Sequence, residues 1–162
     1  MPFTDSVLDA VAGHEMYSFL DGFSGYNQVH MHPADQEKTT FVTEWDVFIV
    51  VVMMFGLKTA PTMFQRIISE VFSDYIPTFM EVFQDDFGVY VTWKDHLHHL
   101  RLCLERCRRA RLSLNSTKCT FRVTSGTLLG HIVSKEGILV DPGIIDAIIK
   151  SPTLKNEKAL GR

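Results

Sequence analysis

Two short apolar segments separated by an acidic turn constrain the fold of this chain more than any other feature of its sequence. Phe79–Phe83 and Phe87–Val91 are almost wholly apolar and have the length of β-strands. The residues between them are Gln84, Asp85 and Asp86. This pattern predicts a β-hairpin whose strands lie in a core and whose turn carries two adjacent carboxylates. Because like charges are costly to bury together unless a cation neutralises them, the turn is expected to bind a cation.

Apolar spacing along the rest of the chain predicts helices and strands that alternate. The expected elements are helices over 4–12, 62–72, 95–109 and 144–149, and strands over 17–20, 39–43, 47–53, 112–114, 120–123 and 128–133. Thr4 and Asp95 are expected to cap two of these helices. Since hairpins and helices interleave, the sequence predicts an α+β fold, with helices packed on one face of an antiparallel sheet and residues 1–162 forming a single domain.

Particular apolar positions are expected to face the core. In the helix over 62–72 they are Met63, Ile67, Ile68 and Val71, and in the helix over 95–109 they are Leu97, Leu100, Leu104 and Cys107. The apolar run from Val47 to Phe55 is predicted to be a buried strand rather than a membrane span, which requires about 18 residues.

The amino-acid composition limits which partners the protein can bind and in which cellular compartment it is expected. The chain has 16 basic and 19 acidic side chains and a net charge of −3, which argues against a binder that relies on a large cationic surface. No basic segment followed by an apolar one marks a secretory signal, and the 3 cysteines do not form the pairs of a disulfide framework. We therefore expect an intracellular protein, cytoplasmic or nuclear and not secreted, with no membrane partner.

A third acid, Asp21, stands at the end of the strand predicted over 17–20. Carboxylate oxygens are hard ligands that suit Mg²⁺, which accepts a few carboxylates and keeps water or phosphate oxygens in its other positions. If Asp21 meets Asp85 and Asp86 in the fold, the three acids predict a two-metal site for phosphoryl transfer. The alternative is an ordinary turn, in which Asp residues make local hydrogen bonds and have no catalytic role.

Further motifs accompany these acids. In order along the chain they are Phe19–Gln28, Lys38–Thr43, Phe55–Pro61 followed by Phe64 and Gln65, Phe83–Asp86, Leu114 and Asn115 followed by Lys118 and Cys119, and Leu129–Ile132. With this set of motifs, the chain resembles the reverse transcriptases of gypsy-type long-terminal-repeat retrotransposons. The resemblance extends from about Pro2 to the last residue. The resemblance implies a polymerase palm with the fingers largely missing. It also implies an RNA-directed DNA polymerase that extends a primer on an RNA or DNA template with dNTPs.

Roles for individual residues follow from the resemblance. Asp21 and Asp85 would hold two Mg²⁺ ions, which Mn²⁺ can replace, with Asp86 as the third acid. The Gly22 carbonyl would be a further ligand. Nucleotide contacts would come from Gly22, Tyr26, Phe55, Gly56 and Gln65. Tyr26 would lie under the sugar and exclude a 2′-hydroxyl, whereas without the resemblance it is a core aromatic. The primer backbone would be held by a hairpin made of Leu129, Gly130 and His131.

Departures from the family pattern leave a second interpretation open. Gln84 replaces the usual apolar residue, Met54 replaces a Pro, and Asp46 replaces a Gly. Residues 49–52 also lack the usual basic residue. The chain could thus be a catalytically dead retrotransposon-derived fragment that acts at most as a nucleic-acid or protein binding module. It would associate through a sheet exposed over 41–55. We expect the isolated chain to extend no primer.

A zinc site is a third interpretation. Its candidate ligands follow one another at three- and four-residue steps on one predicted helix, and they are His96, His99, Cys103 and Cys107. The two thiols also fit the apolar stripe of that helix, where cysteine is a common small core residue.

Overall fold

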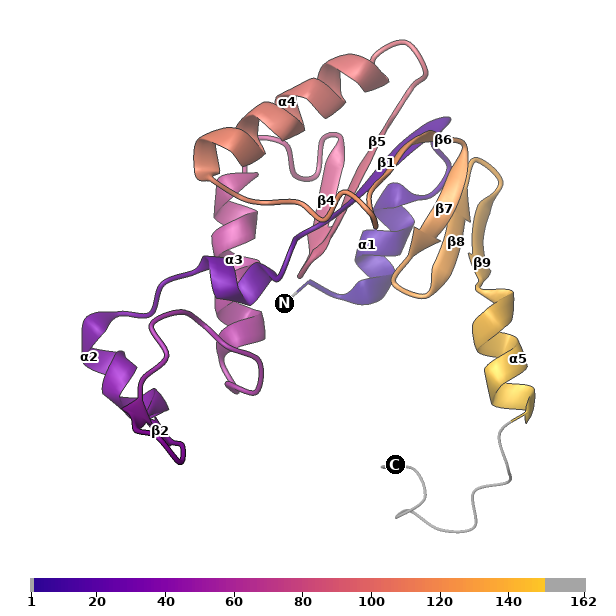
Figure 1. Ribbon diagram of the computed structural model, residues 1–162. Helices are drawn as coiled ribbons and strands as arrows, with labels where there is room; N and C mark the ends of the chain where they lie inside the picture. The colour runs from indigo at the N-terminus through magenta and orange to yellow at the C-terminus, as the bar shows by residue number, and fades with distance from the viewer. Residues whose placement is uncertain (1, 151–162) are drawn as a thin grey trace.

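A four-stranded antiparallel sheet forms the centre of the chain, for which a computed structural model describes residues 2–150 (Figure 1). Its strands lie in the order β4 (Met80–Phe83), β5 (Asp86–Val91), β1 (Met16–Asp21) and β6 (Thr120–Val123). The first two form the predicted hairpin, in which Val82 is paired with Phe87. The apolar segments on either side of the acidic turn therefore supply half of the sheet.

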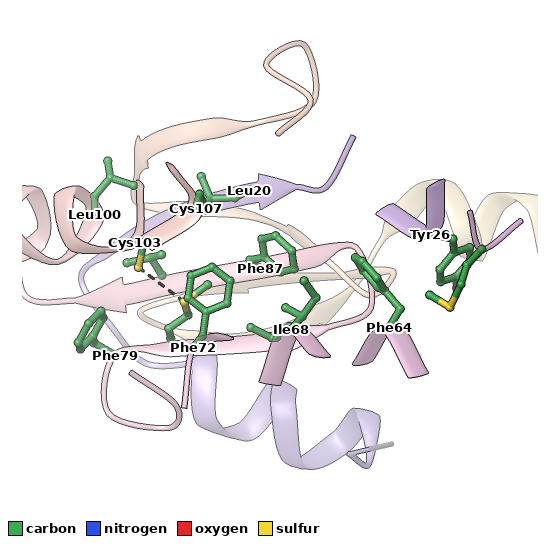
Figure 2. Close-up of a cluster of buried hydrophobic side chains, with 14 of the residues drawn as sticks. Leu20, Tyr26, Phe64, Ile68, Phe72, Phe79, Phe87, Leu100, Cys103 and Cys107 are labelled. Carbon is green, nitrogen blue, oxygen red and sulfur yellow. Dashed lines mark hydrogen bonds between the residues drawn. The ribbon is translucent and has the colours of Figure 1, made fainter. Parts of the chain in front are cut away.

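Helices α3 (Ala60–Val71) and α4 (His96–Ala110) cover one face of this sheet (Figure 1). Figure 2 shows their buried side chains gathered against Phe87 of β5. The residues that meet in this core include Leu20, Phe64, Ile68, Phe72, Phe79, Met80, Val82, Val89, Leu100, Cys103 and Cys107. The predicted α+β fold, an antiparallel sheet with helices packed on it, is confirmed. Residues 151–162 of the predicted single domain lie outside the described residues.

A second layer packs on the opposite side of the sheet. It consists of α1 (Thr4–Val11) and a small antiparallel sheet made of β7 (Ser125–Leu128), β8 (His131–Ser134) and β9 (Gly137–Val140). Val7, Leu8 and Val11 of α1 are buried there, as their spacing predicts. The cap prediction for Thr4 is wrong, because the helix begins after Phe3 and no side chain caps it.

Two other local predictions also differ from the structure. The strand predicted over 128–133 is two strands joined by a turn at Leu129 and Gly130, both of which have positive φ. Asp95 stands at the start of α4 but makes no capping bond. Its carboxylate instead accepts a hydrogen bond of 2.8 Å from the Thr92 hydroxyl.

The buried faces of α3 and α4 are offset by about one position from the predicted stripes. The buried residues are Ala60, Phe64, Gln65 and Ile68 in α3, and His96, Leu100, Cys103 and Cys107 in α4. Met63 and Leu97, which were expected inside, are 38% and 55% exposed. Apolar spacing missed the offset because Gln65 and His96 are polar side chains that are buried with hydrogen-bond partners.

The segment that precedes α3 projects away from the sheet (Figure 1). It contains α2 (Pro33–Gln36), the 3-10 turn η2 (Glu37–Thr39), β2 (Phe41–Val42) and β3 (Val47–Phe48). Val47 and Phe48 are 57% and 46% exposed, and β2 and β3 pair only with each other. The prediction of a buried strand over Val47–Phe55 is therefore wrong, since an apolar run does not reveal whether anything packs against it. Association through this exposed hairpin stays a prediction.

The zinc interpretation finds no support in residues 2–150. Cys103 Sγ donates to Met80 Sδ at 3.6 Å, and His96 Nε2 lies 2.7 Å from Ser18 Oγ. Within the same range, no three His, Cys, Asp or Glu side chains converge as metal ligands. Nor does any helix of the described chain have the length and apolar character needed to cross a membrane.

The buried His96 predicts acid sensitivity. Burial lowers the pKa of its imidazole, and the nearby positive charges of Arg122 and His99 lower it further. The unfolded chain therefore binds a proton near the ordinary pKa while the folded chain does not, so stability falls as pH drops below about 6.5. Urea unfolding at pH 7 and pH 5 should show a smaller acid loss for His96→Gln than for the wild type. His98→Gln, which changes an exposed histidine of the same helix, should lose as much stability as the wild type. Equal losses in all three proteins would contradict this account.

Candidate active site

Pairing between β1 and β5 brings the separated acids together at one end of the sheet. In the register of these strands, Asp21 lies directly opposite Asp86. One residue further along, the Gly22 N–H donates a hydrogen bond of 2.8 Å to the Asp85 carbonyl. The expectation that Asp21 meets the acidic turn is thus confirmed by the backbone of the sheet itself.

A cleft of about 220 Å³ opens at this end of the sheet. Its lining residues are Asp21, Gly22, Phe23, Ser24, Phe55, Asp85, Asn115 and Lys118. Two of the three predicted catalytic acids, Asp21 and Asp85, therefore share one cavity. Asp86 does not line this cavity, although it is paired with Asp21 on the neighbouring strand.

The two acids in the cleft sit in different surroundings. Asp85 Oδ1 is buried, and it has no hydrogen-bond partner within the described part of the chain. Burial raises the pKa of the Asp85 carboxyl, and the negative charges of Asp21 and Asp86 raise it further, while Lys118 opposes them. Asp21 Oδ2 instead lies 3.4 Å from the Lys118 ammonium. The cleft therefore combines one carboxylate that lacks a partner with one that has a cationic neighbour.

Gly25 and Tyr26 are buried at the start of the 3-10 turn η1 (Gly25–Gln28), next to the cleft. Gly25 is pressed against Asp85 Oδ1, and a Cβ added to it would lie 2.6 Å from Phe64 Cζ. Tyr26 is buried and packs edge-to-face on Phe64 and on Phe55, at ring-centre distances of 5.4 Å and 4.9 Å. Phe55 lines the cleft, so Tyr26 supports one of its walls from behind.

The resemblance implied that Gln65 contacts the nucleotide, but Gln65 does not line the cleft. It is only 5% exposed, and its amide is hydrogen-bonded to the acidic hairpin. Its Oε1 accepts from the Gln84 N–H at 2.6 Å, and its Nε2 donates to the Val82 carbonyl at 2.9 Å. Gln84 has a φ of 53°, in the left-handed region. Gln65 therefore fixes the turn that carries Asp85. Its place among the apolar residues of α3 could have indicated that its amide is buried, but not which groups it binds.

The remaining predicted site residues lie outside the cleft lining. Gly56 is exposed in a turn and has a φ of 94°. Leu129 and Gly130 form the turn between β7 and β8, and His131 begins β8 with its Nδ1 3.0 Å from the Leu129 carbonyl. The predicted nucleotide and primer contacts of these four residues stay predictions. Asn115 and Lys118, by contrast, line the cleft although no individual role was predicted for either residue.

An antiparallel sheet flanked by helices, with two carboxylates in a cleft at its end, defines a palm-like α+β domain. The family model for reverse transcriptase (RNA-dependent DNA polymerase) matches residues 2–133. The chain therefore belongs to the reverse transcriptase family.

The curated relatives that this chain matches are much longer proteins. The retrovirus-related Pol polyprotein of the Drosophila melanogaster transposon opus is 34% identical over 100% of this chain. That of transposon 412 from the same organism is 32% identical over 94% of it. The chain spans 16% of the first relative and 12% of the second. It is thus similar to the reverse transcriptase domain of retrotransposon Pol polyproteins, which does not favour a dead fragment.

Solved structures agree on the fold. The foamy viral protease-reverse transcriptase in complex with an RNA/DNA hybrid has a TM-score of 0.85 at 19% identity, over 98% of this chain and 22% of that chain. The foamy viral protease-reverse transcriptase dRH in complex with double-stranded DNA has a TM-score of 0.88 at 18% identity, over 99% of this chain and 28% of that chain. Both matches confirm the palm-like fold.

Replacing Gly25 by Ala should destabilise the chain. The added methyl group has no room between Asp85 Oδ1 and Phe64, so the turn or the acidic hairpin must shift, which costs about 1–3 kcal/mol of unfolding free energy. Gly22→Ala is the matched control, because its Cβ would meet no atom closer than 3.6 Å. Chemical denaturation of both variants measures the difference, and an equal cost at the two positions would contradict the packing described.

Gln65→Met should also lower stability, because it removes both bonds to the hairpin while keeping a side chain of similar length. The Gln84 N–H and the Val82 carbonyl would lose their partners, at a cost of about 1–3 kcal/mol. Gln36→Met, which removes a single bond to the Met31 carbonyl on the projecting segment, should cost less. Amide hydrogen exchange should show faster exchange at Gln84 in the first variant alone. An unchanged exchange rate at that amide would contradict the role of Gln65 in holding the acidic turn.

Proposed function

We propose that this chain is the palm of a gypsy-type retrotransposon reverse transcriptase, and that its cleft is the site of nucleotidyl transfer to a primer 3′-hydroxyl. The observation that carries the proposal is the convergence of Asp21 and Asp85, from segments far apart in sequence, on one cleft at the end of the sheet. The proposed partners are an RNA or DNA template with its primer, and a dNTP.

The residues of the cleft fit a divalent cation of the Mg²⁺ type. Asp85 Oδ1 is a buried carboxylate oxygen with no hydrogen-bond partner among residues 2–150, and Asp21 supplies hard oxygens beside it. No three ligand side chains converge in the described residues. Mg²⁺ does not need three, since it is commonly bound by one or two carboxylates and takes water and substrate phosphate oxygens in its other positions. Mn²⁺ is the natural substitute in experiments.

The chain's own residues would position the reacting groups. Asp21 and Asp85 would hold two divalent ions, with Asp86 adding negative charge from its position beside Asp21 on the neighbouring strand. When bound, such ions lower the pKa of the attacking hydroxyl and stabilise charge on the attacking and leaving oxygens. The exposed ring of Phe55, with Tyr26 packed behind it, would form the wall against the nucleotide. Gln65 would act indirectly, by fixing the turn that presents Asp85.

The departure at Gln84 is compatible with this role. The hydrogen bond that fixes the turn uses the Gln84 backbone N–H and not its side chain. A polar residue can therefore replace an apolar one at this position without loss of the hydrogen bond to Gln65. The nucleic acids in the foamy viral complexes support a nucleic-acid partner for this fold, and the polymerase activity proposed here is that of the longer protein to which such a domain belongs.

Asp85→Asn tests the proposed site, because it removes the charge of the carboxylate that lacks a partner while keeping its shape. Calorimetric titration of the chain with Mn²⁺ should show binding by the wild type and a loss of at least about tenfold in affinity for Asp85→Asn. Asp9→Asn, which changes an exposed acid on α1, should bind Mn²⁺ like the wild type. If Asp85→Asn bound Mn²⁺ as tightly as the control, the proposed metal site would be wrong.

A further inference from the structure

Lys118 lies on a loop that is hydrogen-bonded to both backbone groups of Asp21. The Asn115 N–H donates to the Asp21 carbonyl at 2.8 Å, and the Asp21 N–H donates to Cys119 Sγ at 3.4 Å. The loop is closed on itself, because the Lys118 N–H donates to the Asn115 carbonyl at 3.0 Å. The position from which Lys118 projects is therefore set by the same residue that its ammonium group approaches.

The start of this loop is held equally closely to the segment after β1. The Ser113 N–H donates to Gln28 Oε1 at 2.7 Å, and the Ser113 carbonyl accepts from the Phe23 N–H at 3.0 Å. Leu114 forms a β-bridge with Gly22. The loop thus continues the sheet beside the cleft.

The ammonium group of Lys118 shares the cleft with the two acids. Its Nζ lies 3.4 Å from Asp21 Oδ2, and its side chain is 67% exposed. Asp21 is 17% exposed, so the acid is fixed in the wall while the cation reaches it from solvent. The pair is therefore accessible, and the long lysine side chain can leave without disturbing the sheet.

We propose that Lys118 competes with a divalent cation for Asp21. A metal ion bound by Asp21 must take an oxygen that the ammonium group now approaches, and two cations this close repel each other. The inference rests on the proposed function, because it assumes that Asp21 and Asp85 bind the ion. It adds that the affinity for the divalent ion depends on the Lys118 ammonium group as well as on the two acids.

Lys118→Met should tighten Mn²⁺ binding. Loss of a single positive charge at this distance in a partly exposed site should raise the affinity roughly three- to tenfold in a calorimetric titration of the full chain. Lys118→Arg, which keeps the charge, should stay closer to the wild type than Lys118→Met does.

Lys135→Met provides the matched control. Lys135 also pairs with a carboxylate, its Nζ lying 3.5 Å from Glu15 Oε1 with 63% of its side chain exposed, but it lies outside the acidic cleft. Its removal changes the net charge equally and should leave Mn²⁺ affinity near the wild-type value. Equal affinities for Lys118→Met and Lys135→Met would overturn the competition.

Asp85→Asn separates the two proposals. If it loses Mn²⁺ binding while Lys118→Met binds like the wild type, the metal site stands and the competition is wrong. If Asp85→Asn retains full affinity, the proposed metal site itself fails. A thermal melt of Lys118→Met with and without Mn²⁺ gives a second readout, and the metal should raise its melting temperature by more than it raises that of the wild type.

Discussion

The placement of like charges at the end of an apolar sheet is the constraint on which the site depends. The strands β1 and β5 pair through almost wholly buried residues, and this pairing forces Asp21 and Asp86 into register. The Gly22 N–H then fixes the Asp85 carbonyl at the turn. Because the backbone sets these positions, the three acids stay close together as long as the sheet is intact. Their repulsion favours a proton on Asp85, whose pKa is raised, or a cation beside the acids.

Four segments far apart in sequence build the cleft. The three that surround Asp21 and Asp85 are each held by different chemistry. The turn after β1 fits against Asp85 because Gly25 has no side chain, and Tyr26 packs between Phe64 and Phe55. The acidic turn is clamped by a buried amide on α3. The loop that carries Lys118 is bonded to the backbone of β1. The position of the acids thus depends on packing and hydrogen bonds that lie outside the cleft.

The sequence predicted the hairpin, the acidic turn and the fold class, because strand periodicity and turn chemistry are local properties. It misjudged features that depend on what packs where. Most of the run from Val47 to Phe55 is apolar yet exposed, although Met53 is buried, since no element in residues 2–150 covers β2 and β3. Gln65 and His96 are polar yet buried, because each finds partners on a distant strand. The role of Gln65 was missed for the same reason, because the resemblance marks a position and does not describe its contacts. Its place among the apolar residues of α3 could only have indicated that it is buried.

A crystal structure of the chain grown with Mn²⁺ and recorded with anomalous scattering tests the central claim most directly, because it locates the ion instead of inferring it from affinity. The account predicts an anomalous peak in the cleft, coordinated by carboxylate oxygens of Asp21 and Asp85, with the Lys118 ammonium moved away from Asp21. A bound ion elsewhere on the chain, together with an empty cleft and an intact Lys118–Asp21 pair, would contradict it.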